Sequence, residues 1–332
     1  MNSLADIIAL AEAYEQELPP AGKPQAMPQG KAIAGWIDHT LLKPEASAAQ
    51  IKQLCQEALQ YEFASVCINP AFVPLAHGLL AGSKVAVCTV VGFPLGATLP
   101  TYKAFETLAS LQAGAQEIDM VLNVGALKGE AYGLVWNDIQ AVVQVAHNAG
   151  ALVKVILENV LLTRREKILG CLISQAAGAD FVKTSTGFAA GGATQEDVAL
   201  MRRLVGPKVG VKAAGGIRSL EDALGMIRSG ANRIGASAGV KILRGTDGLL
   251  GGLDDGVHGK FGRHGQGRGR HGLLERQAGR AAAPQGAHLA RGGRGRRQAG
   301  RARRGGLAEG RRAPREEALR AALPGVGGPP LA

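Results

Sequence analysis

The chain has 332 residues, of which 46% are hydrophobic and 20% are charged, and its formal net charge is +11 at pH 7. This length holds one large α/β barrel or two ordinary domains. Residues 1–243 carry 20 Lys and Arg against 20 Asp and Glu, so the basic excess lies in residues 244–332 and does not make the body a nucleic-acid-binding protein. No run of about eighteen apolar residues is present, which argues against a membrane-spanning helix.

Cysteine usage indicates a reducing compartment. The N-terminus lacks the basic flank and the continuous apolar core of a signal peptide. We therefore expect a cytoplasmic protein. The four cysteines form no CxxC pair, as is typical of buried, small apolar residues, and they are Cys55, Cys67, Cys88 and Cys171.

The chain begins with a predicted helix. Residues 3–17 place apolar side chains at helical spacing, and Ser3 is available as the cap. The stretch PPAGKPQAMPQG that follows is a linker by composition. We assign residues 1–30 to an N-terminal helix and linker, and the helix either packs against the body or lies free.

From about residue 33 to residue 240 the sequence repeats one unit: an apolar strand, a turn and an amphipathic helix. Several helices close on a glycine, which suits the left-handed residue just past a helix end. N-cap residues precede three helices, at Thr163, Thr194 and Ser219. The predicted strands are 36–40, 63–68, 84–91, 117–122, 152–157, 180–184, 209–213 and 232–235. The predicted helices include 48–59, 102–113, 135–149, 164–177, 195–204 and 220–229.

Eight such units predict an α/β fold, a compact (β/α)8 TIM barrel over residues 31–243. An open, doubly wound parallel sheet is the alternative. That fold calls for a glycine fingerprint after the first strand, and the stretch WIDHTLLKP contains none. The barrel is therefore our prediction.

The composition changes at residue 244. Residues 244–332 contain 17 Arg and one Lys against 7 Asp and Glu, and no helical or strand period is sustained there. Such a segment cannot bury enough apolar surface to offset its ordering entropy, so we predict a disordered Arg/Gly-rich tail. Its abrupt onset suggests the hypothesis of translation in a shifted reading frame, which would truncate the eighth helix. Any nucleic-acid binding is expected from this tail alone, without sequence specificity.

Two lysines stand at the ends of consecutive predicted strands. Lys183 lies in FVKTSTG and Lys212 lies in VGVKAAGGI. If the strand ends meet, each ammonium favours the neutral form of the other, and a neutral amine can form a Schiff base with a carbonyl. The alternative is a pair of solvated charges at the rim of a sheet.

Charged residues on neighbouring strands indicate a supporting network. Asp119 points into the barrel if its neighbour Ile118 faces the helices. There it either carries protons, directly or through a water, or serves as the charge partner of a lysine. By the same alternation, Lys154 and Glu158 share a face, and Asp38 joins the network from the first strand.

Two glycine-rich turns, AAGGIRS and GASAGV, follow the predicted seventh and eighth strands. Backbone N–H groups at such turns form an anion site suited to a phosphate ester, although glycine turns also serve tight packing. Histidines at metal-ligand spacing are lacking, so we predict no metal site, and we predict no serine nucleophile either. Covalent amine chemistry is the class that best fits these residues.

Eight motifs occur in the order and spacing of one enzyme family: IDHTLLKP (37–44), VCINPAFV (66–73), VVGFPLG (90–96), EIDMVLNVG (117–125), KVILE (154–158), FVKTSTGF (181–188), GVKAAGGIR (210–218) and RIGASAGV (233–240). Over roughly residues 30–243 the chain resembles deoxyribose-phosphate aldolase of the bacterial class I type. The resemblance implies a TIM barrel that reversibly cleaves 2-deoxy-D-ribose 5-phosphate into glyceraldehyde 3-phosphate and acetaldehyde, with no metal or other cofactor.

The resemblance also implies roles for individual residues. Lys183 matches the family's Schiff-base lysine, Lys212 the second lysine that perturbs it, and Asp119 the aspartate that moves protons through water. Phe188 stands where some relatives carry a lysine. The supporting network would contain Asp38, Lys154 and Thr184. The phosphate-binding turns would contain Gly215, Gly216, Gly235, Ala236 and Ser237.

Two alternative functions stay open at this point. Another lysine-dependent barrel aldolase, such as a transaldolase or a keto-acid aldolase, would share the Schiff-base lysine. An inactive barrel that carries a basic binding tail would share the fold, but the tail lacks the interleaved aromatic residues of a stacking platform. The partners we expect are a phosphorylated sugar and aldehydes, and the sequence leaves a homo-oligomer open.

Overall fold

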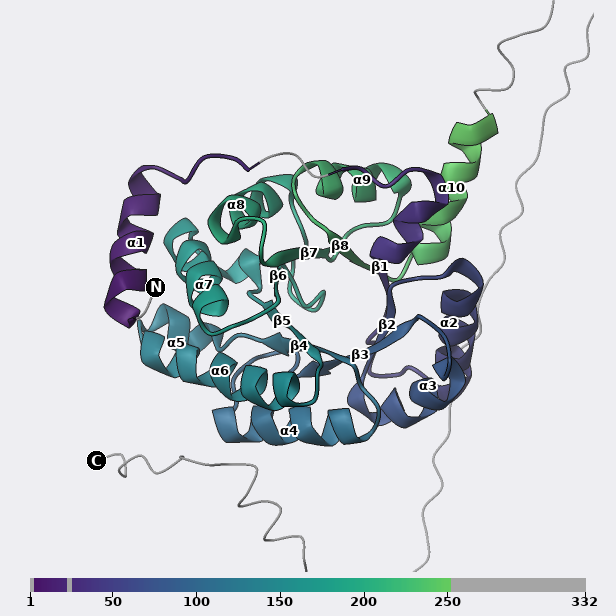
Figure 1. The fold of residues 1–332 in the computed structure, drawn as a ribbon, viewed down its shortest axis with the longest axis horizontal. Coiled ribbons are helices and arrows are strands. Elements are labelled where there is room, and N and C mark those ends of the chain that lie inside the picture. The colour runs from purple at the N-terminus through teal and green to yellow at the C-terminus, as the bar shows by residue number, and fades with distance from the viewer. Residues whose placement is uncertain (1–2, 23–25, 252–332) are drawn as a thin grey trace, which may run out of the picture. The chain divides into compact units, whose positions relative to one another are not determined.

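The computed structural model describes residues 3–22 and 26–251, which build an eight-stranded α/β barrel (Figure 1). Neighbouring strands pair in parallel, and β8 pairs back onto β1 to close the ring. The predicted TIM barrel is confirmed, and the open doubly wound sheet is excluded. The strands are β1 (Ile37–Leu41), β2 (Ser65–Ile68), β3 (Ala86–Val91), β4 (Glu117–Val121), β5 (Leu152–Ile156), β6 (Phe181–Lys183), β7 (Gly210–Ala214) and β8 (Arg233–Ala236).

Helices surround the barrel and alternate with its strands (Figure 1). The expected caps are present, because Thr163, Thr194 and Ser219 each accept a hydrogen bond from the backbone N–H three residues on. The α-helices are α1 (Leu4–Gln16), α2 (Ala48–Tyr61), α3 (Val73–Leu80), α4 (Pro100–Gln112), α5 (Val124–Lys128), α6 (Tyr132–Asn148), α7 (Arg164–Ala176), α8 (Gln195–Val205), α9 (Leu220–Arg228) and α10 (Gly239–Gly251). Three short 3-10 helices are η1 (Gly30–Trp36), η2 (Pro70–Phe72) and η3 (Asn159–Leu161).

Alternation along the strands separates an apolar layer from a polar interior. Ile118 and Met120 of β4 belong to the main apolar core, whereas Asp119 between them faces the inside of the barrel. The same alternation directs Lys154 of β5 and Lys212 of β7 inward. The apolar layer thus joins strands to helices and leaves charged groups inside the ring.

Glycine at two inward positions makes room for large neighbours. A Cβ on Gly210 would lie 2.1 Å from the ring of Phe181 on the adjacent strand. A Cβ on Gly235 would lie 3.1 Å from Cε of Lys212. These two glycines therefore let β7 and β8 accommodate bulky side chains that cross the interior.

The N-terminal helix α1 lies against α7 (Figure 1). Ile7 and Ala11 are fully buried in this contact, and Arg165 of α7 bonds Glu15 at 2.5 Å. Arg203 of α8 holds the chain just after α1 through two backbone carbonyls. Of the two arrangements that the sequence left open, packing against the body is the correct one.

The last helix, α10, corrects the expected end of the barrel. We expected no regular structure from residue 244, whereas α10 continues to Gly251. Ile242, Leu243 and Thr246 are buried, because their spacing repeats the helix period and puts them on one side of α10. The rest of the predicted tail, residues 252–332, lies outside the described residues.

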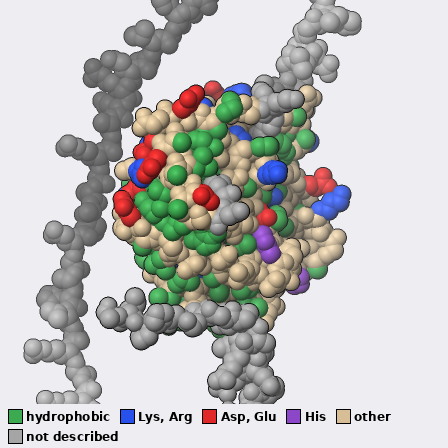
Figure 2. Space-filling model, turned by 60° about the vertical axis from the view of Figure 1, so that its left-hand side comes forward, with side chains coloured by type: hydrophobic (Ala, Val, Ile, Leu, Met, Phe, Trp, Pro, Cys, Tyr) green, Lys and Arg blue, Asp and Glu red, His purple; other side chains and the backbone are tan. Residues whose placement is uncertain are grey.

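The described surface is mixed in character. Figure 2 shows acidic, basic and apolar side chains together on one face of the molecule, in keeping with the balanced charge of residues 1–243. Among the helices of the described residues, none is both long enough and apolar enough to cross a membrane.

Candidate active site

Three lysines from neighbouring strands converge on one aspartate inside the barrel. Asp119 of β4 accepts a hydrogen bond from Lys154 of β5 at 2.8 Å through Oδ1. Its other oxygen, Oδ2, accepts from Lys183 of β6 and Lys212 of β7, each at 2.7 Å. The strand register explains the convergence, because the lysines of β6 and β7 stand opposite each other, as do Asp119 and Lys154. All four residues are buried, with an exposed fraction of at most 2%.

Two more carboxylates and an arginine extend this cluster. Asp38 of β1 accepts from Lys212 through Oδ2 and from Arg233 of β8 through Oδ1, the latter at 2.7 Å. Glu117 of β4 lies 2.6 Å from Lys154 and 3.3 Å from Arg233. Asp38 and Lys154 were expected from the sequence, whereas Arg233 and Glu117 were not assigned to the site. Period-two alternation could have found both, since each stands two residues from an inward position on its strand.

Burial and charge oppose each other in the cluster, and charge prevails. Burial alone raises the pKa of Asp119, but the three surrounding ammonium groups hold that pKa well below its usual value. Burial lowers the pKa of Lys212, yet Asp119 and Asp38 outweigh it and hold that pKa well above the ordinary range. The pKa of Lys154 is likewise raised against burial, chiefly by Asp119. The like charge of Lys154 lowers the pKa of Lys212, but the two carboxylates that flank this ammonium outweigh that effect.

The balance of charges singles out one lysine. The cluster has four basic and three acidic members, so it becomes neutral when one basic group loses its proton. Among the described residues, Lys183 has one carboxylate partner, whereas Lys212 has two and Lys154 has three. Lys183 is thus the lysine with the least carboxylate support. The four basic members are Lys154, Lys183, Lys212 and Arg233, and the three acidic members are Asp38, Glu117 and Asp119.

An apolar wall stands beside the charged cluster. Two of its members reach Asp119, since Cys88 Sγ lies 3.2 Å from Oδ1 and Cys67 Sγ lies 3.9 Å from Oδ2. The interior therefore offers charged groups next to a small apolar surface. The wall is separate from the main core and consists of Leu42, Cys67, Cys88 and Val90, with Phe93 packed against it.

Two groups of described side chains have the spacing of metal ligands. Each has three ligand atoms within 4.8 Å of one another, from Cys67, Cys88 and Asp119 in one group and from Asp38, Cys88 and Glu117 in the other. The carboxylates of both groups already bond ammonium or guanidinium groups. A metal cation would have to displace those charges, so we assign no metal site to either group.

The two turns expected to bind phosphate follow β7 and β8, at the carboxyl ends of these strands. Gly215 and Gly216 both have left-handed backbone conformation, with φ of 85° and 81°. Among the described residues, no hydrogen bond uses the backbone N–H of Gly216 or of Ser237, and both residues are exposed. The backbone N–H groups just before α9 are not free in this way, because the carboxylate of Asp222 accepts from two of them. The free donors therefore belong to the turns themselves.

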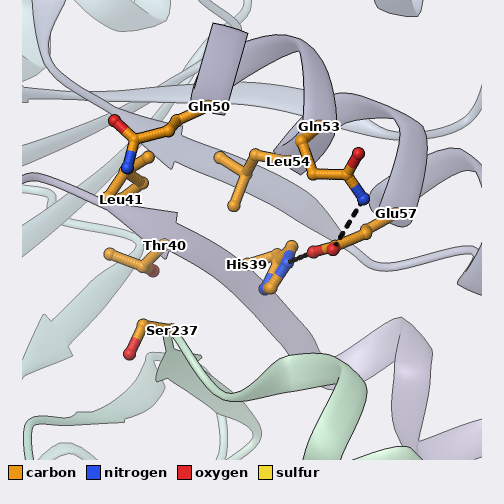
Figure 3. Close-up of a pocket in the computed structure, with 8 residues that line it drawn as sticks. All are labelled: His39, Thr40, Leu41, Gln50, Gln53, Leu54, Glu57 and Ser237. Carbon is orange, nitrogen blue, oxygen red and sulfur yellow. Dashed lines mark hydrogen bonds and ion pairs between the residues drawn. The ribbon is translucent and has the colours of Figure 1, made fainter. Parts of the chain in front are cut away.

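A pocket of about 220 Å³ opens beside the turn after β8 (Figure 3). Ser237 lines it from that turn, whereas Gly235 and Ala236 are buried at the end of β8. Across the pocket, His39 of β1 turns toward Glu57 of α2 and bonds it at 2.7 Å. No member of the charged cluster lines this pocket, whose other walls are Thr40, Leu41, Gln50, Gln53 and Leu54.

One expected supporting residue lies outside the charged cluster. Thr184 exchanges hydrogen bonds with the backbone of Ala214, both at 3.1 Å, and so ties β6 to β7. Glu158, placed in the same network by alternation, instead accepts from the backbone and side chain of Thr186. Both side chains fix the segment after β6, and among the described residues neither side chain hydrogen-bonds a lysine amine.

Two phenylalanines join the loops that follow β3 and β6. The rings of Phe93 and Phe188 meet edge to face, with centroids 5.2 Å apart and an interplanar angle of 89°. These strands are not neighbours in the barrel, so the contact spans part of its opening. Phe188 is 50% exposed while Lys183 is 2% exposed, and Phe93 also packs on the apolar wall. The pair thus covers the interior from the side of solvent.

The sequence matches the family described as DeoC/LacD family aldolase over residues 33–247. The chain belongs to the DeoC/LacD aldolase family. Similar members are named deoxyribose-phosphate aldolase. The Macrococcus caseolyticus protein is 61% identical over 215 residues, which cover 65% of this chain and 97% of that protein. The Clostridium perfringens protein is 59% identical over 213 residues, which cover 64% of this chain and 95% of that protein.

Two solved structures are similar to this DeoC/LacD barrel. A crystal structure of a proposed deoxyribose-phosphate aldolase from Coccidioides immitis has a TM-score of 0.70 and 42% identity, covering 74% of this chain and 100% of that one. The deoxyribose phosphate aldolase of Aeropyrum pernix, described as tetrameric, has a TM-score of 0.63 and 34% identity, covering 74% and 99%. The family match includes every strand that contributes to the charged cluster.

Proposed function

We propose that the chain is a class I aldolase that reversibly cleaves 2-deoxy-D-ribose 5-phosphate into D-glyceraldehyde 3-phosphate and acetaldehyde, with Lys183 as the Schiff-base lysine. The observation that carries the proposal is the placement of Lys183 and Lys212 against one oxygen of Asp119 inside a closed barrel. The relatives named deoxyribose-phosphate aldolase support it. The reaction belongs to the catabolism of deoxyribose phosphates.

Lys183 supplies the nucleophile. Its amine, once free of its proton, attacks the aldehyde carbon of the open-chain sugar, and loss of water from the adduct gives an iminium. The iminium accepts the electron pair of the C2–C3 bond as that bond breaks, so cleavage leaves an enamine instead of a free carbanion. Protonation of the enamine and hydrolysis of the iminium then release acetaldehyde and restore the amine. The surroundings of Lys183 support this role, because among the described residues its one carboxylate partner is the Asp119 that it shares with Lys212.

Lys212 and Asp119 carry the protons of these steps. Loss of water from the first adduct needs a proton donor, and cleavage of the C2–C3 bond needs an acceptor for the C3 hydroxyl proton. Lys212 is the donor, since Asp38 and Asp119 keep it charged. Asp119 accepts protons through a water, and its contact with Lys183 places it one hydrogen bond from the reacting nitrogen. Lys154 positions Asp119 by holding its other oxygen.

The phosphate of the sugar binds at the turns after β7 and β8. The free backbone N–H groups there support this assignment, because such donors suit a phosphate. The turns adjoin the lysines, since Gly235 lies against the side chain of Lys212. The apolar wall beside Asp119 receives the two-carbon fragment that leaves as acetaldehyde. The residues assigned to the phosphate are Gly215, Gly216, Gly235, Ala236 and Ser237.

The domain bounds, the compartment and the self-association of the enzyme are also part of the proposal. The aldolase domain spans residues 31–243, with its last helix continued in α10, and it follows the N-terminal helix and linker at residues 1–30. The four cysteines are free, which suits the reducing cytoplasm. The tetrameric description of the Aeropyrum pernix relative supports self-association of this chain, which light scattering would measure.

Covalent trapping and turnover test the proposed function. Reduction with borohydride in the presence of acetaldehyde should leave an ethyl group on Lys183, which peptide mapping by mass spectrometry would locate. Lys183→Ala should cleave 2-deoxy-D-ribose 5-phosphate at least about 10³-fold more slowly than the wild type, because the nucleophile is gone. Equal rates for the two proteins would overturn the proposal.

A matched control separates the effect of losing the Lys183 amine from the effect of replacing any other lysine with alanine. Lys52 is exposed on α2, so Lys52→Ala should cleave the sugar phosphate at the wild-type rate and take up the same ethyl group. The choice of carbonyl separates the related aldolases. Trapping with pyruvate, and none with acetaldehyde, would identify a keto-acid aldolase instead.

A further inference from the structure

Two of the four cysteines lie inside the barrel, beside Asp119, and the proposed reaction uses neither. We propose that Cys67 and Cys88 form a dithiol that a hydroperoxide oxidises to a disulfide, which reversibly switches off the active site. The inference concerns thiol chemistry and does not rest on the identity of the sugar. Its readouts below include two that need no enzyme activity, so its failure is distinguishable from failure of the proposed function.

The strands place the two thiols side by side. Cys67 of β2 and Cys88 of β3 are direct partners in the parallel ladder. Their Sγ atoms and an oxygen of Asp119 all lie within 4.8 Å of one another. Neighbouring strands are about 4.8 Å apart, within the usual separation of bridged Cα atoms, and inward side chains of a closed barrel converge. A disulfide between these two positions therefore needs little movement of the backbone.

The surroundings make the two thiols unequal, as a reactive thiol and its resolving partner require. The neighbouring Cys88 and the ammonium groups of Lys212 and Lys183 lower the pKa of Cys67 against the effect of burial. Burial, the neighbouring Cys67 and Asp119 raise the pKa of Cys88, against the opposing effect of Lys154, whose Nζ lies 3.3 Å from its sulfur. Thiolate character therefore concentrates on Cys67, which becomes the nucleophile.

A small oxidant can reach this pair by the route that the substrate needs. Both sulfur atoms touch the carboxylate that Lys183 also touches, at 3.9 Å for Cys67 and 3.2 Å for Cys88. Any aldehyde that meets the amine of Lys183 must therefore pass within a few ångströms of the thiols. Hydrogen peroxide is smaller than any such aldehyde.

The oxidation balances with peroxide as the only co-reactant. The thiolate of Cys67 attacks one oxygen of hydrogen peroxide, which forms an S–O bond, breaks the O–O bond and releases hydroxide. The hydroxide takes up the proton that Cys67 gave up and leaves as water. The sulfur of Cys88 then attacks the sulfenic sulfur of Cys67, which forms the S–S bond and releases a second water. Two thiols lose one electron each, and both oxygens of the peroxide are reduced.

The disulfide changes the active site through Asp119. Cys88 stops donating to Oδ1, and the bridge pulls both sulfur atoms out of their places in the apolar wall. The carboxylate that Lys183 and Lys212 share then has a different set of neighbours, and the wall loses its shape. Oxidised enzyme should therefore lose activity, and a dithiol reductant should restore it.

The experiment treats the full-length protein with a small excess of hydrogen peroxide and follows four quantities. The free thiols, counted after denaturation, should fall from four to two, and the intact mass should fall by two hydrogens. Peptide mapping should join the peptides of Cys67 and Cys88. Retro-aldol turnover should fall with the thiol count and return after dithiothreitol.

Two kinds of variant complete the test. Cys55→Ser and Cys171→Ser remove buried thiols whose pKa is raised by burial, to about 11 for Cys55, so they should keep the wild-type response to peroxide. Cys88→Ser removes the resolving thiol, so peroxide should add oxygen to Cys67, without a disulfide. Retention of all four thiols in the wild type, or oxidation of Cys55 or Cys171 before the inner pair, would overturn the proposal.

Discussion

Lys183 and Lys212 donate to the same oxygen of Asp119, Oδ2, each at 2.7 Å, from opposite positions on adjacent strands. Their surroundings differ in one respect that matters for chemistry. Lys212 also bonds Asp38, while Lys183 has no second carboxylate among the described residues. Lys212 is therefore held as an ammonium by two carboxylates. Among the described residues, Lys183 has only the carboxylate of Asp119, which it shares with Lys212. This asymmetry gives the two amines different roles.

Removal of the Lys212 ammonium should slow the reaction strongly. Lys212→Met takes away the proposed proton donor and one of the two ammonium groups that bond Oδ2 of Asp119. We expect turnover of 2-deoxy-D-ribose 5-phosphate to fall by about 10²–10⁴-fold, the usual worth of a positioned acid or base. Steady-state kinetics measure it. Urea unfolding of the same sample shows that the loss is not one of fold, and turnover within threefold of the wild type would contradict the role.

Acid should weaken the fold through Asp38 and Asp119. Burial alone raises the pKa of each carboxyl, but the basic groups around them, Lys212 first for Asp38 and Lys154 first for Asp119, lower both. A carboxyl whose pKa is lower in the folded state stabilises the fold above its unfolded pKa, about 3.9. That contribution is lost as the pH falls through the folded pKa. The free energy of unfolding should therefore decline below about pH 5.

The variant Asp38→Asn isolates one of these carboxyls. The amide cannot titrate, so the decline of the unfolding free energy with falling pH should be shallower than in the wild type, whatever the offset at pH 7. Urea unfolding at several pH values between about 7 and 3 measures both slopes. Parallel curves for the two proteins would show that Asp38 contributes nothing to acid sensitivity.

The sequence predicted the barrel because its strands alternate in a simple way. The strand expected at 117–122 is β4 at residues 117–121, and the inward placement of Asp119 followed from period two once Ile118 was taken to face the helices. Helix α3 was not among the helices named from the sequence, because its local composition argues against a helix. Its sequence, VPLAHGLL, contains a proline and a glycine, but the proline stands in the first turn, where a helix tolerates it.

The partners within the site could not be predicted in the same way. Asp38 and Arg233 are 195 positions apart and meet because β8 closes onto β1. Which carboxylate serves which lysine depends on strand register around the whole ring, and no local window of sequence contains that information. The two carboxylates around Lys212 could not be foreseen for this reason, since Asp38 was a candidate but its contact with Lys212 was not known.

The aromatic pair at the opening should limit access to Lys183. Phe188→Ala removes the edge-to-face contact with Phe93 that joins the loops after β3 and β6. Such a contact is worth about 0.5–1.5 kcal/mol, so loss of activity to an amine-modifying reagent should become about two- to tenfold faster. The rate of inactivation by an imidoester measures this. Phe188→Tyr keeps the ring and should react at the wild-type rate, and equal rates for all three proteins would rule out a covering role.

A buried ion pair outside the barrel should contribute to stability only while both partners are present. Lys103 of α4 and Asp138 of α6 are 0% exposed and 2.5 Å apart, and Lys103 also donates to the carbonyl of Val121 at 2.8 Å. Asp138→Asn leaves a buried ammonium without its counter-charge and should lower the unfolding free energy by about 3–5 kcal/mol. The double variant Lys103→Met, Asp138→Leu removes both charges and should recover most of that loss. Urea unfolding compares the three proteins, and a single variant as stable as the wild type would mean that water or another group already neutralises Lys103.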